Sequence, residues 1–421
     1  MRPSFALLAC ILAGALAAQS FDDELRRGLL ALSGNDLPQA RQGLEAASRL
    51  QPENAMVWAA LAQTYLRARE AALANEAAGR AARLAPADSP VKHALAMFYS
   101  ETGDLAKAAD AERQYASGKS ADPQAAARAA DLSLRAGEAQ QAILWATTAL
   151  SKGGGAALHH LLGQAYAAAN QPDPSLRELR AAVESDPKVE EFVFDLGQMQ
   201  LRAGDFTGAL ATFDRGRQRF PASAQIELAY GVAAYGQRRF TEAIDAFLRV
   251  IGLDASVEQP YVFLARLLDQ AEDRLPRIAA AYAAWEKAEP GNPLPPCLYA
   301  KALGATGIDP ARVEAELRRS IQLSERYWES HFELGVLLEK RGDWRAAAAE
   351  LKRSIELNPE HAPAHFQLAR AYDKLGQREL AQAERAEHER LTAAETGVGE
   401  MPAPGTTTVR EWPEPKGKPT P

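Results

Sequence analysis

Cysteine is almost missing from this 421-residue chain, which contains only Cys10 and Cys297. Cys10 falls within an apolar N-terminal segment, and removal of that segment would leave Cys297 alone, so we expect no internal disulfide. Paired cysteines at the spacing of zinc ligands are absent as well. Cys297 has no recognisable catalytic setting, and we interpret it as a buried or groove-lining small apolar residue.

An excess of positive charge is also lacking, because the formal net charge is −7. A general nucleic-acid-binding protein would carry a basic stripe, so the sequence predicts no nucleic-acid partner. Beyond the N-terminal segment, no apolar run approaches the ~20 residues that span a membrane. We therefore expect no integral membrane span in the mature chain.

Motifs that carry chemistry are missing too. Gly118–Ser120 resembles the end of a phosphate loop, but the glycine required five residues earlier is absent. His361 and His365 are four apart, yet Pro363 marks a helix start between them and leaves His361 off the helical face. No nucleophile stands at motif spacing from a base. We predict no catalytic residue, no cofactor and no metal site, with an enzyme site hidden in the irregular middle of the chain as the alternative.

What the chain does contain is a period of 34 residues. Ala40, Ala74, Ala108 and Ala142 stand at that spacing without a break. Within each unit, apolar residues recur at i, i+3, i+4 and i+7, which is one face of an α-helix. A Gly, Asn or Asp turn follows, and then a second helix rich in alanine. A repeat of this length and pattern predicts a helical solenoid.

The pattern resembles the tetratricopeptide repeat (TPR) in one unit through Trp58, Leu61, Ala62, Tyr65, Ala74, Ala81 and Pro86. The resemblance covers roughly residues 20 to 392 and implies an all-α fold, an α-solenoid superhelix of about eleven 34-residue helix-turn-helix repeats. Between residues 252 and 330 the phase slips, because Pro276 opens a helix early and Ile308–Pro310 replaces the usual turn. We expect a bend or a changed stacking angle there.

Three segments follow from these patterns. Residues 1–17 read as a signal peptide, because Phe5–Leu16 is apolar and Ala15–Ala17 supplies an A-x-A cleavage site; an uncleaved anchor is the alternative. Residues 18–392 form the solenoid, and residues 393–421 form a Pro-rich tail that we expect to be disordered. A docking motif around Trp412 is the alternative for the tail. We expect a bacterial protein that is exported through a cleaved Sec-type signal to the periplasm or secreted.

The resemblance also implies where a partner would bind. In this family the concave wall is built from the first helix of each unit, at its second, fifth, ninth and twelfth positions. The residues at those positions are Gln63, His93, Met97, Asp131, His160, Gln164, Phe194, Gln198, Leu228, Val232, Tyr235, Val262, Arg266, Phe332, Phe366 and Arg370. Lys301 and Cys297 join them if the irregular unit keeps its phase. This mixture of rings and amides suits an extended peptide.

The sequence thus predicts a non-enzymatic scaffold for protein–protein interaction, which holds a protein or an extended peptide in the groove of an exported solenoid. The Asn and Lys set that clamps a C-terminal carboxylate in some family members is not visible. A structural or assembly subunit of an envelope or secretion complex is the alternative, and it would form a stable stoichiometric complex rather than bind a peptide transiently.

Overall fold

The computed structural model describes residues 20–118, 122–307 and 309–397, and all the regular elements in these ranges are helices. The all-α solenoid that the sequence predicts is therefore confirmed. Contacts divide the chain into two units, one ending at Pro187 and the other beginning at Lys188. The predicted signal peptide (1–17) and most of the predicted tail (393–421) lie outside the described residues, and the first residues of that tail continue the last helix.

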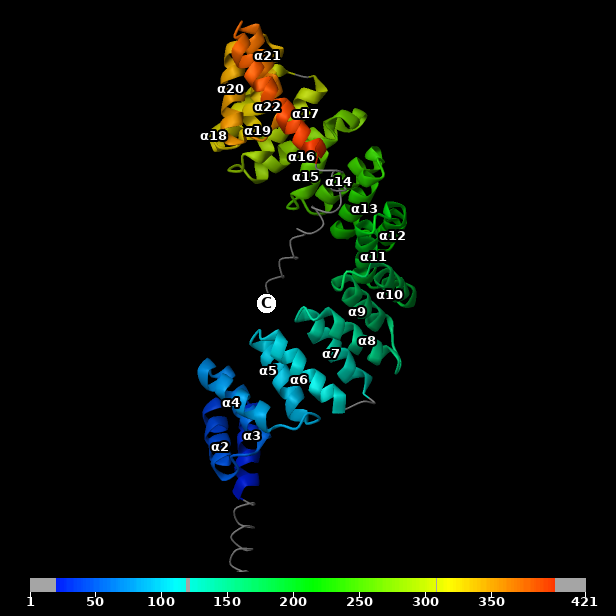
Figure 1. Cartoon of the computed structure of the whole chain (residues 1–421), viewed down its shortest axis with the longest axis vertical. Coiled ribbons are helices and arrows are strands. Elements are labelled where there is room, and N and C mark those ends of the chain that lie inside the picture. The colour runs from blue at the N-terminus through cyan, green and yellow to red at the C-terminus, as the bar shows by residue number, and fades with distance from the viewer. Residues whose placement is uncertain (1–19, 119–121, 308, 398–421) are drawn as a thin grey trace, which may run out of the picture. The chain divides into compact units, whose positions relative to one another are not determined.

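Over its described residues, the first unit forms five consecutive pairs of helices, which follow one another in chain order (Figure 1). Its first helix occupies residues 20–33 of the described chain. The others are α2 (Leu37–Leu50), α3 (Ala55–Arg67), α4 (Ala71–Leu84), α5 (Pro90–Glu101), α6 (Leu105–Gly118), α7 (Pro123–Arg135), α8 (Ala139–Leu150), α9 (Ala156–Ala168) and α10 (Pro172–Ser185).

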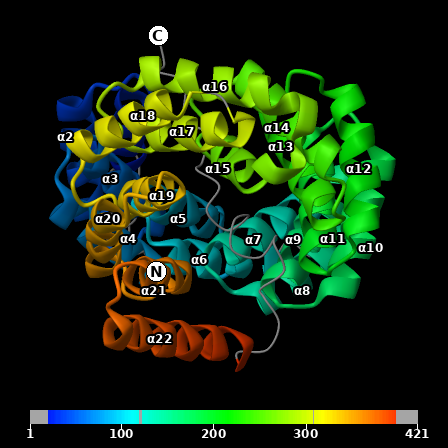
Figure 2. The same cartoon turned by 90° about the horizontal axis from the view of Figure 1, so that it is seen from above.

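The second unit continues the same pairing through its described residues. Its helices are α11 (Glu190–Arg202), α12 (Phe206–Arg219), α13 (Ala224–Gly236), α14 (Phe240–Leu253), α15 (Gln259–Arg266), α16 (Leu275–Ala288), α17 (Leu294–Thr306), α18 (Pro310–Leu323), α19 (Trp328–Lys340), α20 (Trp344–Leu357), α21 (Ala362–Lys374) and α22 (Arg378–Gly397). The long α22, visible along its length in Figure 2, packs against α21. We call the odd-numbered helices, together with helix 20–33, the first helices of the pairs.

Small residues on the first helices meet large residues on their partners. Gly197 on α11 lies so close to Phe213 on α12 that an added Cβ would stand 2.3 Å from the ring. The same sixteen-residue spacing joins Gly28 to Leu44, Gly163 to Leu179, Gly231 to Phe247 and Gly335 to Leu351. The small residue of the repeat thus makes room for a leucine or phenylalanine that fills the centre of the pair.

The turn inside each pair requires a left-handed backbone. Gly103, Gly204 and Gly376 have φ angles of 83°, 76° and 76°. Arg69 and Arg238 adopt φ angles of 62° and 58° at the same place in their repeats. Glycine is favoured at such positions because a Cβ is strained there. Gly103, Gly204 and Gly376 therefore mark the turns inside their pairs, whereas Gly197 and its equivalents mark helix crossings.

The irregular stretch of the sequence is irregular in the structure as well. The first helix of that pair, α15, has 8 residues and is followed by the 3₁₀ turns η1 (Leu268–Gln270) and η2 (Glu272–Arg274). Pro276 stands in the first turn of α16, as predicted. Asp309 has a φ of 47° and caps α18 through hydrogen bonds from the Ala311 and Arg312 amides to its carboxylate. The pairing of helices survives, but this first helix is shortened.

Among the described residues, no helix combines the length and the apolar character that crossing a membrane requires.

Candidate functional site

All sixteen predicted groove residues lie on first helices, six in the first unit and ten in the second. Their exposure divides them into three groups. The exposed residues are Met97, Asp131, Arg266, Phe366 and Arg370. The half-buried residues are Gln63, His93, Gln164, Gln198, Tyr235, Val262 and Phe332. The buried residues are His160, Phe194, Leu228 and Val232. A partner can reach these four buried residues only through the small exposed part of each side chain.

Phe194 shows why a groove position can be buried. Its side chain is 8% exposed, and its ring centroid lies 6.4 Å from that of Phe213 on α12. Phe366, at the equivalent place on α21, is 45% exposed, and its ring centroid lies 5.4 Å from that of His388. Phe194 therefore contributes mainly to packing, whereas Phe366 presents an aromatic face to a partner.

The first unit contains a cavity of about 860 Å³, which we call the Met97 groove. Three successive first helices line it, and most of the lining is apolar. The apolar residues are Leu29 and Leu32 on helix 20–33, Met56, Ala59 and Ala60 on α3, and Pro90, Val91, Ala94 and Met97 on α5. Met56 and Met97 are 49% and 61% exposed. Unbranched, polarisable methionine side chains adapt to the shape of an apolar partner.

One end of the Met97 groove is polar. There Gln63 Nε2 donates a hydrogen bond to Glu101 Oε2 at 3.1 Å. Arg67 Nη1 donates to the backbone carbonyl of Leu32 at 3.1 Å. Arg67 forms no ion pair with any described residue, so its guanidinium is the cation that this end of the groove offers to a ligand.

The second unit contains a smaller cavity of about 420 Å³, the Lys301 pocket, which is lined by residues of α15, η1, α17, α18 and α19. Its charged residues are Arg266, Asp269, Lys301, Glu333 and Lys340. Lys301 Nζ lies 3.1 Å from Glu333 Oε1 and 3.4 Å from Glu329 Oε1. This pocket offers charges of both signs, whereas the Met97 groove offers mainly apolar surface.

The ion pairs around Lys301 set its ionisation. Burial lowers the pKa of Lys301, but the Glu333 and Glu329 carboxylates outweigh burial and raise the pKa overall. Lys301 is thus held as a paired ammonium, which does not suit a general base or a nucleophile. Cys297 on the same helix is fully buried, and burial raises the pKa of its thiol well above the ordinary value. Its burial agrees with the interpretation of a small apolar residue.

The structure adds residues that the sequence reasoning missed. Met56, Arg67 and Glu101 belong to the Met97 groove, and Lys340 and Glu333 to the Lys301 pocket. Met56 is the second residue of α3 and Ala59 the fifth. The rule that takes the second, fifth, ninth and twelfth positions of each first helix would have found both. Arg67 is the thirteenth residue of α3, and Glu101 is its equivalent one 34-residue period later, so both stand one position beyond the last that the rule considers.

Histidines connect the two helices within several repeats. The Nδ1 atom of His93 lies 2.7 Å from a Glu112 carboxylate oxygen, and His365 Nδ1 lies 2.6 Å from one of Glu384. His159 with Glu178 and His331 with Glu350 repeat this arrangement at the same separation of nineteen residues. His361 is the N-cap of α21 and stands off its helical face, as predicted. These contacts give the histidines a role in packing.

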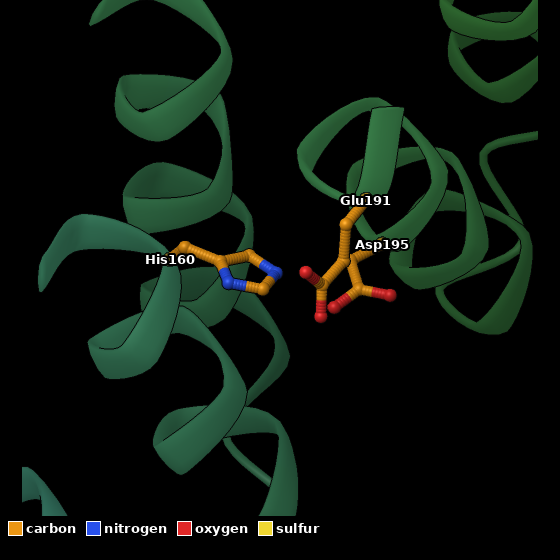
Figure 3. A group of neighbouring side chains, drawn as sticks. All are labelled: His160, Glu191 and Asp195. Atoms are coloured by element: carbon orange, nitrogen blue, oxygen red, sulfur yellow. The ribbon is translucent and has the colours of Figure 1, made fainter. Parts of the chain in front are cut away.

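Acidic residues that could attract a cation occur on α11. Glu191 and Asp195 lie one turn apart on this helix of the second unit, and His160 lies on α9 of the first unit (Figure 3). Glu191 is exposed and Asp195 is half-buried, and exposed acidic groups are common without an ion. Within the second unit the pair supplies two ligands, fewer than the three protein ligands of a catalytic zinc site.

Comparison with known proteins identifies the repeat. Models of the tetratricopeptide repeat match residues 160–224, 200–258 and 338–386. The chain thus contains TPR units within residues 160–258 and 338–386. No curated protein matches the chain at a significant level.

Several solved structures resemble the chain at low sequence identity. YrrB, "a TPR protein with an unusual peptide-binding site", is 20% identical over 44% of this chain and 95% of its own, with a TM-score of 0.37. Yeast Tom70 is 16% identical over 90% of this chain and 92% of its own, with a TM-score of 0.38. The C-terminal part of a TPR repeat-containing protein from Cytophaga hutchinsonii is 17% identical over 65% of this chain and 98% of its own, with a TM-score of 0.44. Likenesses this distant carry no information about partners.

Proposed function

We propose that this protein is a non-enzymatic interaction scaffold that binds a protein or peptide partner on the first helices of its TPR solenoid. The observation that supports this most is the Met97 groove, in which two exposed methionines and other apolar residues of three successive helices line one cavity. Contiguous exposed apolar surface of this kind is unusual on a protein without a partner. The exposed ring of Phe366 adds an anchor of the type that dominates interfaces.

We further propose that the scaffold works outside the cytoplasm, in the periplasm or after secretion. The apolar segment Phe5–Leu16 and the A-x-A sequence Ala15–Ala17 support this part of the proposal. Export also limits the class of partner, because the ligand must be an envelope or extracellular protein.

Affinity capture with matched variants tests the proposal. The full chain would be used to capture partners from the exported fraction, and the partners would be identified by mass spectrometry. Met97→Glu and Phe366→Ala alter the two exposed anchors, and Leu144→Glu alters an equally exposed leucine on α8, a second helix. We expect Phe366→Ala to weaken a partner that uses this ring by about 1–2 kcal/mol. A partner retained by both anchor variants, but lost when residues 398–421 are deleted, would assign recognition to the tail.

A further inference from the structure

The walls of the Met97 groove limit the conformation that a ligand can adopt. The groove is lined by helix 20–33, α3 and α5, whose backbone amides and carbonyls are engaged in their own helical hydrogen bonds. A sheet edge, which would pair with an extended strand, is not among the described elements of the groove. The side-chain donors are few, and Gln63 already donates to Glu101. An extended peptide would therefore bury unpaired backbone groups against methionine and alanine.

A helical ligand avoids this cost because it satisfies its own backbone. From the groove's apolar floor and the unpaired cation at its end, we propose that the Met97 groove binds the apolar face of an amphipathic α-helix that places a carboxylate beside Arg67. This inference rests on the proposed scaffold function and specifies its ligand in the first unit. Leucine or methionine anchors at i, i+4 and i+7 would lie between Met56 and Met97.

The small residues of the floor fit this mode of binding. Ala59 and Ala60 on α3 and Ala94 on α5 line the groove together with the two methionines. Short side chains let an incoming helix approach the floor closely, and the methionines adapt to its anchors. The cavity of about 860 Å³ has room for several side chains of leucine size.

The polar end fixes the direction of the ligand through charge. Arg67 donates one hydrogen bond to the Leu32 carbonyl and has no carboxylate partner among the described residues. Glu101 at the same end already accepts a hydrogen bond from Gln63. A ligand carboxylate can bind the Arg67 fork through two hydrogen bonds, whereas Glu101 stays negatively charged and disfavours a carboxylate on its own side of the groove.

Fluorescence anisotropy with designed peptides tests the inference on the full chain. The probe is a labelled peptide of about 18 residues with leucines at i, i+4, i+7 and i+11 and a terminal glutamate. One control peptide carries two central prolines that prevent a helix, and another carries lysine in place of the glutamate. The protein variants are Met97→Glu, Arg67→Glu and the matched exposed control Leu144→Glu, with circular dichroism to confirm that each is folded.

We expect the helical peptide to bind the wild type and Leu144→Glu equally, and Met97→Glu at least about tenfold more weakly. Arg67→Glu should weaken the glutamate peptide about threefold and should prefer the lysine peptide. If the proline peptide binds as well and remains sensitive to Met97→Glu, the helical ligand is wrong while the scaffold function stands.

Two further results would also overturn the inference. If the helical peptide does not bind at about 1 mM, the inference of a helical ligand is wrong. The capture experiment then tests the scaffold function separately. Self-association of the chain that Met97→Glu abolishes would assign the groove to a second copy of the protein.

Discussion

At the scale of single residues, the glycines inside the first helices are needed for packing, although glycine has a low helix propensity. Gly197 lies in the interior of α11, where alanine would favour the helix by about 1 kcal/mol. An alanine Cβ would stand 2.3 Å from the Phe213 ring, and Phe213 is fully buried and cannot move aside freely. Overpacking of this kind costs about 1–3 kcal/mol, so the clash outweighs the gain in propensity.

We therefore predict that Gly197→Ala lowers the free energy of unfolding by about 1–2 kcal/mol. Urea unfolding followed by circular dichroism measures the change. Gly304→Ala on α17 is the matched control, because no atom lies within 4 Å of the added Cβ. This control should stabilise the protein by up to about 1 kcal/mol. In a Phe213→Ala background, which removes the ring, Gly197→Ala should no longer destabilise the protein, and an unchanged loss would argue against the ring contact as its cause.

Glu227 on α13 gives a prediction about pH. Its side chain is 2% exposed, and Oε1 lies 3.0 Å from Arg217 Nη2 and 3.4 Å from Arg249 Nε. Burial raises the pKa of Glu227 above its ordinary value of 4.5, although the two arginines partly offset burial. The folded state thus holds this proton more tightly than the unfolded state does. The stability that Glu227 contributes is complete below pH 4.5 and is lost as the pH rises through the folded-state pKa.

Glu227→Gln removes this titration. We predict that the stability of the variant relative to the wild type rises as the pH increases above 4.5. Urea midpoints at about pH 4, 5.5 and 7 for both proteins measure the trend. If the difference in urea midpoint between the variant and the wild type stays constant over this pH range, Glu227 does not titrate within it.

At the scale of the elements, each short helix depends on its neighbours. Helices of about a dozen residues are marginal in water, so stability comes from stacking one pair on the next. On α4 the alanine of the 34-residue period, Ala74, is 1% exposed and belongs to the core, whereas Ala72 is exposed. The two residues have the same identity and stand on the same helix, but only one lies at a helix crossing.

We predict that Ala74→Phe destabilises the first unit by at least about 1–3 kcal/mol. Ala72→Phe should change the melting temperature little, because its side chain extends into solvent. Thermal unfolding of the two variants compares them directly. Equal melting temperatures would contradict the assignment of Ala74 to the packing face.

The 34-residue period predicted most of the helices. Each helix pair packs mainly on the next pair in the chain, so the residues at these contacts recur at the same spacing. The alanines and glycines at 34-residue spacing mark helix crossings and turns, and the structure places Ala74, Gly197 and Gly204 in those roles. The shortened α15 was less predictable, because two 3₁₀ turns replace its last residues without a strong breaker in the sequence.

The groove was harder to predict because exposure depends on what packs beside each position. Phe194 and Phe366 hold equivalent positions, yet the first is 8% exposed and lies against Phe213, while the second is 45% exposed. The Met97 groove requires three helices from three repeats, and a rule applied to one helix at a time does not reveal it. The rule on helix positions includes Met56, whereas only the structure shows that Arg67 lines the groove.

At the scale of the whole molecule, contacts run mainly between helices that are neighbours in the chain. The Met97 groove belongs to the first unit and the Lys301 pocket to the second. In repeat proteins, a change in one repeat acts mainly on that repeat and its neighbours. Variants at Met97 and Phe366 therefore test two separate parts of the scaffold, and the loss of a partner with one but not the other would locate the binding repeats.

The export proposal leads to a prediction about the mature protein. The A-x-A sequence Ala15–Ala17 follows the apolar run Phe5–Leu16, so we predict that signal peptidase cleaves after Ala17 and that the mature chain begins at Ala18. Intact-mass measurement of protein from the exported fraction determines this terminus. Ala17→Trp is the test variant, because a bulky residue does not fit a cleavage site that requires small side chains, and it should accumulate as the uncleaved precursor. Wild-type protein that retains Met1 in the cytoplasm would contradict both the signal peptide and the proposed compartment, and the search for partners would then turn to cytoplasmic proteins.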